Sequence, residues 1–184
     1  MRKIIAAMNM TLDGFCDHTA GIVDDETHQH YNDLLKSADT LIYGRTTYQL
    51  MESYWPELVK NPSGNKQEDD FAVLIDAIHK IVYSRTMKEV DWKNSILKHE
   101  IIRKEIVDMK QQEGKNILVG SPSMIVAFTK LGLIDEYQIN VNPVILGKGL
   151  VLFKNIEKQI DLTLLKTKTF KGGGVVLYYK PVKE

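Results

Sequence analysis

The sequence predicts an α/β fold: a mixed, mainly parallel central sheet flanked by helices, with antiparallel strands at the carboxyl end. Two observations predict it. Over most of the chain, short apolar runs alternate with helix-like stretches, which is the pattern of β-α-β units. Beyond Gly132, strand-like segments follow one another without intervening helices, which is typical of antiparallel pairing.

Apolar runs bounded by polar or small residues predict the individual strands. We expect strands at residues 4–8, 40–43, 80–84, 95–98, 116–119, 136–144, 162–170 and 175–180. Helices are expected at residues 25–37, 46–54, 71–78 and 101–112. One more helix is well marked, because Ser121 can cap it, Pro122 suits its first turn and Gly132 follows its last turn. Residues 61–70 read as an exposed loop within a single domain spanning residues 1–184.

Composition excludes several classes of partner. The chain has 184 residues, and its 24 basic and 24 acidic residues cancel, so no overall field attracts nucleic acid or anionic lipid. Cys16 is the single cysteine, which excludes an internal disulfide and fits a reducing, cytoplasmic location. The amino-terminal apolar run is too short to span a membrane. His28 and His30 are two apart and would point to different faces of a helix, so no metal is expected.

Three of the predicted strands run directly into small and hydroxyl residues, and two of these turns carry an arginine. The turns contain Gly44, Arg45 and Thr46; Ser84, Arg85 and Thr86; and Gly120, Ser121, Pro122 and Ser123. The carboxyl ends of parallel strands lie along one edge of a sheet, where α/β proteins bind ligands. We therefore expect the three turns, taken as strand-to-helix turns, to face one ligand.

The chemistry of these turns suits phosphate groups. A helix amino terminus offers unpaired N–H groups, glycine permits close approach, hydroxyls add donors, and arginine adds a forked permanent charge. Two arginine-bearing turns match NADP, which has a pyrophosphate and a separate 2′-phosphate. For any one turn, helix-capping hydroxyls and a solvated arginine are an equally good interpretation. The three turns together favour a ligand.

Six segments, in order over nearly the whole chain, resemble the dihydrofolate reductase-like superfamily. They are residues 10–15, 43–48, 84–86, 118–121, 132–137 and 143–149. Within that superfamily the chain is most similar to the carboxyl-terminal reductase domain of the riboflavin biosynthesis protein RibD. The resemblance implies a dihydrofolate reductase-like fold, NADPH laid across the strand ends, and often a homodimer. It also implies hydride transfer to a heterocyclic small molecule, as in 5-amino-6-(5-phosphoribosylamino)uracil reductase.

The resemblance also implies roles for individual residues. Cofactor phosphates would contact Gly44, Arg45 and Thr46; the adenosine 2′-phosphate would contact Ser84 and Arg85; the pyrophosphate and nicotinamide side would contact Gly120, Ser121 and Ser123; and Ala7 and Asp13 would border the nicotinamide and substrate. Asp13 is the candidate catalytic residue, orienting substrate or relaying a proton. Judged without the family, Asp13 is at least as good a turn former.

Two alternative functions remain beside the riboflavin-type reductase. Folate enzymes have paired glycines where this chain has Gly120 and Ser121, so dihydrofolate reductase proper is the second hypothesis. A non-catalytic NADP-binding module of the same fold is the third. The acidic residues 24–26 are expected to serve the helix dipole rather than bind a pterin. Trp55 and Trp92 are expected in the core, with a ring-binding pocket as the alternative.

Overall fold

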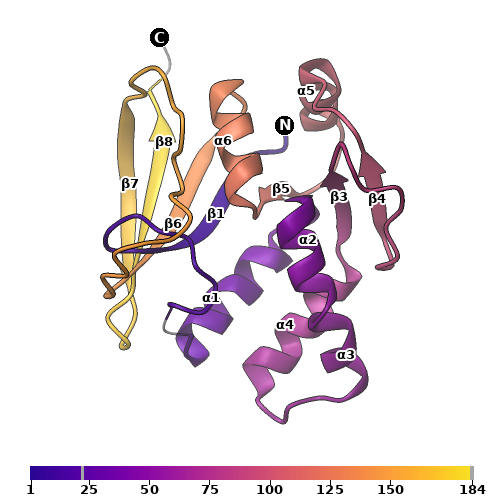
Figure 1. Ribbon diagram of the computed structural model, residues 1–184, viewed down its shortest axis with the longest axis vertical. Helices are drawn as coiled ribbons and strands as arrows, with labels where there is room; N and C mark the ends of the chain where they lie inside the picture. Colours follow the sequence, from indigo (N-terminus) through magenta and orange to yellow (C-terminus); the bar gives the residue numbers. More distant parts are fainter. Residues whose placement is uncertain (22, 183–184) are drawn as a thin grey trace.

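A computed structural model describes residues 1–21 and 23–182. Within these ranges it has one eight-stranded sheet in the order β4-β3-β2-β5-β1-β6-β8-β7 (Figure 1). The strands are β1 (Ile4–Thr11), β2 (Ala38–Gly44), β3 (His79–Tyr83), β4 (Ser95–Lys98), β5 (Asn116–Val119), β6 (Glu136–Asn142), β7 (Leu162–Thr169) and β8 (Val175–Pro181). Strands β1 to β6 pair in parallel, whereas β8 runs antiparallel to both β6 and β7. The predicted mixed sheet is confirmed.

Helices cover both faces of the sheet because residues of the central strands alternate between two apolar cores. In β1, Ile4 and Ala6 join one core, and Ile5 and Ala7 join the other. The helices are α1 (Asp25–Lys36), α2 (Arg45–Glu52), α3 (Trp55–Lys60), α4 (Lys66–Ala77), α5 (Arg103–Gln111) and α6 (Pro122–Lys130). Residues of α5 and α6 contribute to the first core, and residues of α1, α2 and α4 to the second. This two-sided burial is typical of parallel sheets.

Two helical predictions need correction. The segment expected as one helix at residues 46–54 forms α2 and then α3, with Pro56 in the first turn of α3. The loop expected at residues 61–70 ends at residue 65, because the side chain of Asn65 caps α4 by accepting a hydrogen bond from the N–H of Glu68 over 3.0 Å. The first turn of α4 is polar, and its apolar face begins only at Phe71. The sequence pattern of this turn therefore resembles that of a loop.

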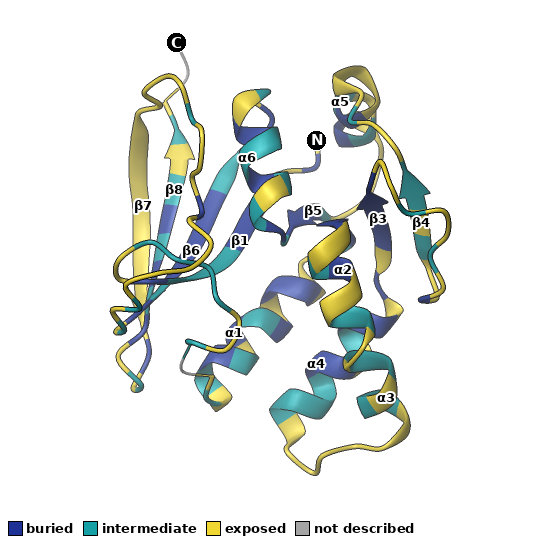
Figure 2. Ribbon diagram, viewed as in Figure 1, coloured by how far each residue is buried: buried dark blue, intermediate teal, exposed yellow. Residues whose placement is uncertain are grey.

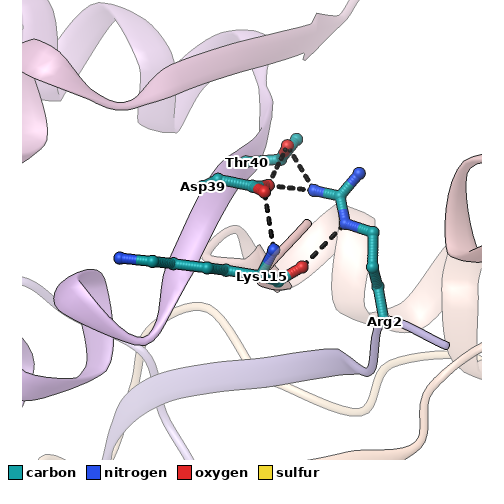
Figure 3. Close-up of polar contacts among 4 residues, drawn as sticks. All are labelled: Arg2, Asp39, Thr40 and Lys115. Atoms are coloured by element: carbon teal, nitrogen blue, oxygen red, sulfur yellow. Dashed lines mark hydrogen bonds and ion pairs between the residues drawn. The ribbon is translucent and has the colours of Figure 1, made fainter. Parts of the chain in front are cut away.

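The amino ends of β1, β2 and β5 are joined by a partly buried polar network (Figure 3). Arg2 forms an ion pair with Asp39, and its Nε donates to the carbonyl oxygen of Lys115 over 2.7 Å. The N–H of Lys115 donates to Asp39 over 2.7 Å, and Arg2 also donates to the hydroxyl of Thr40 over 2.8 Å. This edge of the sheet is therefore closed by its own side chains, and the three turns predicted to bind a ligand lie at the opposite, carboxyl edge.

The edge strand β7 is much more exposed than the central strands of the sheet (Figure 2). Every residue of β7 is exposed, whereas the central strands β2 and β5 are almost entirely buried. None of the helices that the structure describes has the length and apolar character that a membrane-spanning helix needs.

Candidate functional site

The three turns singled out in the sequence lie side by side at the carboxyl edge of the sheet. Their strands are neighbours in the order β3-β2-β5. The N–H of Gly44, after β2, donates to the hydroxyl of Ser121, after β5, over 2.9 Å. The guanidinium of Arg45 donates to the hydroxyl of Thr86, after β3, over 3.2 Å. The predicted proximity of the turns is confirmed, while their binding of phosphate stays a prediction.

Gly44 lies where the amino ends of α2 and α6 approach most closely. A Cβ at this position would lie 2.8 Å from Oγ of Ser123, closer than real Cβ contacts allow. Arg45, Thr46 and Ser123 are exposed around this point. The first-turn N–H groups of a helix lack intrahelical partners and carry partial positive charge. The glycine therefore lets Ser123 pack closely against the backbone beside two helix amino ends, with Arg45 exposed next to them.

Ser121 is placed as predicted but does not do what a capping residue does. It occupies the N-cap position of α6, yet its side chain makes no capping hydrogen bond. The hydroxyl instead accepts a hydrogen bond from the N–H of Gly44 at the end of the neighbouring strand, and the residue is 1% exposed. Gly132 follows α6 with a positive φ of 62°, as expected.

The turn after β3 differs from the other two, because no helix follows it within the described residues. Residues 84–94 connect β3 to β4 without regular structure. The hydroxyl of Ser84 accepts from the N–H groups of Thr86 and Met87, over 3.2 and 3.0 Å, and so forms a local turn that resembles a helix cap. The prediction of a third strand-to-helix turn is wrong. Arg85 is exposed there, without helix N–H groups beside it.

Asp13 lies in the loop after β1 and holds a second loop in place. Its carboxylate accepts from the hydroxyl of Thr11 over 2.6 Å and from the N–H groups of Leu146 and Gly147, at 3.1 and 2.7 Å. These hydrogen bonds, that of Thr11 foremost, hold the pKa of Asp13 below its ordinary value. The geometry supports the turn-forming interpretation, and a catalytic role for Asp13 stays a prediction.

A cavity of about 230 Å³ opens between the sheet and helices α1 to α4. Its wall is mostly apolar and aromatic. The lining residues are Ala7, Met8, Asn9, Val23, Thr27, His28, Tyr31, Leu34, Leu35, Leu41, Tyr43, Met51, Trp55, Phe71, Ile75, Leu118 and Gly120. Because Tyr43 and Gly120 also flank the turns after β2 and β5, the cavity and the candidate phosphate-binding edge are continuous. Asp13 is not among the lining residues.

Polar groups on the cavity wall come from β1 and α1. The hydroxyl of Tyr31 donates to Oδ1 of Asn9 over 2.8 Å, and the side chain of Asn140 donates to the same oxygen over 2.9 Å. Burial raises the pKa of Tyr31 well above its ordinary value, so this hydroxyl keeps its proton at neutral pH. The side-chain oxygen of Asn9 is thus held by two donors. Sequence reasoning missed Asn9 and Tyr31, because they belong to no motif.

The acidic residues at the start of α1 are occupied by other contacts. Asp24 caps the helix by accepting from the N–H of Thr27 over 2.8 Å, which confirms the helix-terminus interpretation for this residue. Asp25 accepts from Asn65 over 3.0 Å. Glu26 accepts from the N–H of Lys171 over 2.7 Å.

The two tryptophans have different surroundings. Trp92 is in the core, as expected, where its indole N–H donates to Asp76 over 2.7 Å. Trp55 lines the cavity instead, with its ring centroid 4.5 Å from that of Phe71. The alternative interpretation of a ring-lined pocket thus holds for Trp55.

Comparison with solved structures supports the same fold. The chain superposes over 98% of its length on 99% of a protein provisionally assigned to riboflavin biosynthesis from Shewanella sp. PV-4, with a TM-score of 0.75 and 20% identity. It also matches 97% of dihydrofolate reductase from Enterococcus faecalis, over 98% of its own length, with a TM-score of 0.66 and 12% identity. Over 98% of its length it also matches 57% of the bifunctional deaminase/reductase of Thermotoga maritima, with a TM-score of 0.66 and 14% identity.

Sequence comparison gives the family. The chain is 35% identical over 182 residues to the uncharacterised protein YyaP of Bacillus subtilis, covering 97% of this chain and 94% of YyaP. It is 28% identical over 193 residues to the uncharacterised protein YwjB of the same organism, covering 97% of each. Residues 2–176 match the family described as the RibD C-terminal domain. The strand-end turns and the cavity therefore lie in a reductase-type domain, and the chain belongs to the RibD C-terminal domain family.

Proposed function

We propose that this protein is an NADPH-dependent reductase that promotes hydride transfer to a carbonyl or imine carbon of a small ring compound. The observation that carries the proposal is the joining of the amino ends of α2 and α6 by the Gly44–Ser121 hydrogen bond, next to Tyr43 and Gly120, which line the cavity. A reductase site needs a place for the phosphates of the dinucleotide, which the helix amino ends offer, and a place for the substrate, which the cavity offers. Family membership supports the oxidoreductase class.

The chain's residues fit the phosphates of such a cofactor. Gly44 has no side chain to block close approach to its backbone, and the helix amino ends beside it favour anions. Arg45 is exposed at the rim and already reaches the turn after β3. Ser84 has its hydroxyl engaged by two backbone N–H groups, so in that turn Arg85 is the better candidate for the 2′-phosphate.

The cavity would orient the substrate and exclude water from the reaction. NADPH supplies the hydride when bound, so the protein needs to align the acceptor, exclude water and let a proton reach the reduced atom. Leu34, Leu118 and Phe71 keep the wall apolar. Tyr31 and Asn9 offer fixed polar atoms that can hold one edge of a ring. The described lining carries no carboxylate to bind a pterin, which disfavours dihydrofolate reductase proper.

The test is cofactor affinity in arginine variants. Arg45→Ala and Arg85→Ala should each weaken NADPH binding by about 1.5 to 3 kcal/mol, the scale of a charge-assisted hydrogen bond. At least one of them should weaken NADH binding much less, because NADH lacks the 2′-phosphate. Isothermal titration calorimetry measures both affinities, with Arg103→Ala, an exposed arginine on α5, as the matched control.

The outcome that contradicts the proposal is equally plain. If the parent does not bind NADPH, or if both arginine variants bind it as the parent does, the strand-end turns do not hold its phosphates. Tight NADPH binding without turnover of any carbonyl, imine or heterocyclic substrate would instead favour the non-catalytic module.

We also propose that two copies of the chain associate through β7. This edge strand exposes Leu162, Leu164 and Leu165, which are 39%, 51% and 46% exposed. Single edge strands of this length are usually covered or protected by charge. On β7 the lysines come only in the second half, at Lys166 and Lys168, so the leucine-rich half is the contact we assign to a second copy.

A further inference from the structure

The cavity differs from the strand-end turns in its lack of charge. None of the described residues that line it is Lys, Arg, Asp or Glu. The exposed arginines of the site, Arg45 and Arg85, belong to the turns after β2 and β3 and are not part of this wall. The arginines proposed to bind phosphate therefore lie at the strand-end turns, outside the cavity wall.

The acidic residues at the start of α1 have partners elsewhere and are not lining residues. Asp24 and Asp25 accept hydrogen bonds from Thr27 and from Asn65, and Glu26 accepts one from Lys171. His28 is the one imidazole on the described wall, which therefore holds no permanently charged side chain to pair with a phosphate or a cationic ring. Placing a charged group against such a wall without a partner is strongly unfavourable.

We propose that the cavity binds an uncharged, planar compound of one or two fused rings and discriminates against phosphorylated ones. Aromatic side chains form its outer part, where Trp55 and Phe71 pack with ring centroids 4.5 Å apart, and His28 packs on Phe71 with centroids 6.3 Å apart. An apolar cavity of about 150 Å³ is enough to bind benzene. The cavity here, at about 230 Å³, has room for a larger ring system.

The polar atoms of the wall can form hydrogen bonds with one edge of a bound ring, but they carry no charge to pair with a charged ligand. The Tyr31 hydroxyl and the Asn9 amide lie together on one side, joined by their 2.8 Å hydrogen bond. A few fixed polar groups in an apolar pocket orient a ligand through single hydrogen bonds. A ring carbonyl that accepts a hydrogen bond from the Asn9 amide meets this requirement, and a charged substituent does not.

The reductive part of this inference rests on the proposed function, whereas ring selection is a property of the cavity itself. In the reaction, the carbonyl carbon gains a hydride and forms a new C–H bond. The π electrons of the C=O bond move to oxygen, which then takes a proton from solvent. The product is an alcohol, and this two-electron reduction balances the oxidation of NADPH to NADP⁺.

The experiment uses two ligands with the same ring, 2-naphthol and 2-naphthyl phosphate. Isothermal titration calorimetry on the full chain, with and without saturating NADP⁺, measures their affinities. The neutral ligand should bind the parent at least about tenfold more tightly than the phosphate, a difference of about 1.4 kcal/mol. Equal or tighter binding of the phosphate in the presence of NADP⁺ overturns the proposal.

A charge introduced at the cavity mouth should change this preference. Val23 lines the cavity and is 52% exposed, so Val23→Arg can place a cation there without burying it. Val73, on α4, is 57% exposed and does not line the cavity. Val23→Arg should tighten binding of 2-naphthyl phosphate at least about fivefold, which is a shift of roughly 1 kcal/mol. Val73→Arg should leave it unchanged, and an equal effect of both variants would contradict the cavity assignment.

Failure of this proposal can be told apart from failure of the proposed function. If NADPH binds through Arg45 but naphthol and naphthyl phosphate bind alike, the reductase assignment stands and the substrate class is wrong. If naphthol binds selectively and NADPH does not bind, the cavity assignment stands and the reductase assignment is wrong.

Discussion

The backbone N–H of Gly44 donates to the hydroxyl of Ser121 over 2.9 Å, and both residues are buried. This hydrogen bond joins the turn after β2 to the turn after β5. It fixes the amino ends of α2 and α6 relative to each other, because each residue is the N-cap of its helix. The candidate phosphate site thus depends on a bond between two helices rather than on either turn alone.

Removal of the Ser121 hydroxyl should cost both stability and cofactor affinity. In Ser121→Ala the buried N–H of Gly44 loses its acceptor, which costs about 1 to 3 kcal/mol of unfolding free energy. NADPH binding should weaken as well, because the two helix ends are no longer held together. Urea denaturation and calorimetry measure the two effects. The matched control is Ser123→Ala, at an exposed residue of the same helix, and a stability loss as large in the control would refute the assignment.

Gly44→Ala separates the packing of the turn from its role in binding. The new methyl group would meet Oγ of Ser123 at 2.8 Å, but this exposed hydroxyl can rotate away, so stability should fall by less than about 1 kcal/mol. NADPH affinity should fall at least about tenfold, since the methyl group fills space that we assign to a phosphate.

The double variant Gly44→Ala/Ser123→Ala tests this separation. It removes the hydroxyl that the methyl group meets, so it should recover the stability of the parent. It should not recover NADPH affinity. Full recovery of affinity would show that Gly44 serves only packing.

The sequence predicted the sheet better than the helices. Buried parallel strands such as β2 and β5 are continuous apolar runs, so their positions and parallel pairing could be inferred directly. The first turn of α4 is polar and exposed, and without apolar periodicity it is indistinguishable from a loop. The break between α2 and α3 falls at Ser53 and Tyr54, which favour neither helix nor loop strongly. Neither error affected the predicted fold class.

The candidate site could be predicted only where residues follow strands directly. Gly44 and Gly120 were found because parallel strand ends meet at one edge. Tyr31 on α1 and Asn9 on β1 come into contact only in the folded chain. No local sequence pattern predicts that contact. Asp13 illustrates the opposite problem, because an Asp before a Gly after a strand serves a loop as readily as a substrate.

His30 predicts a loss of stability in mild acid. Burial, and then the charge of Lys168, lower its pKa from 6.5 to about 4, whereas Asp33 opposes this and Lys166 adds to it. The unfolded chain takes up the proton below pH 6.5, but the folded chain does not until about pH 4. Stability is therefore full above pH 6.5 and falls as pH drops from there toward 4, by about 2 kcal/mol at pH 5.

Urea denaturation of His30→Gln at pH 7.5 and pH 5 tests this contribution. The variant should lose less stability between the two pH values than the parent, whatever its absolute stability. His79→Gln, at an exposed histidine, should retain the pH dependence of the parent. The same pH dependence in all three proteins would show that His30 is protonated equally in the folded and unfolded chains.

The proposed association through β7 predicts a dimer that a single charge can disrupt. Both edges of the sheet expose an aliphatic side chain, Leu164 on β7 at 51% and Ile96 on β4 at 42%. Leu164→Lys should give monomers, because burying an unpaired ammonium in the contact costs more than the lost leucine contributes. Ile96→Lys, at the opposite edge, should remain dimeric. Sedimentation velocity distinguishes the two, and a parent protein that sediments as a monomer at tens of micromolar, roughly the range of weak dimers, would exclude this interface.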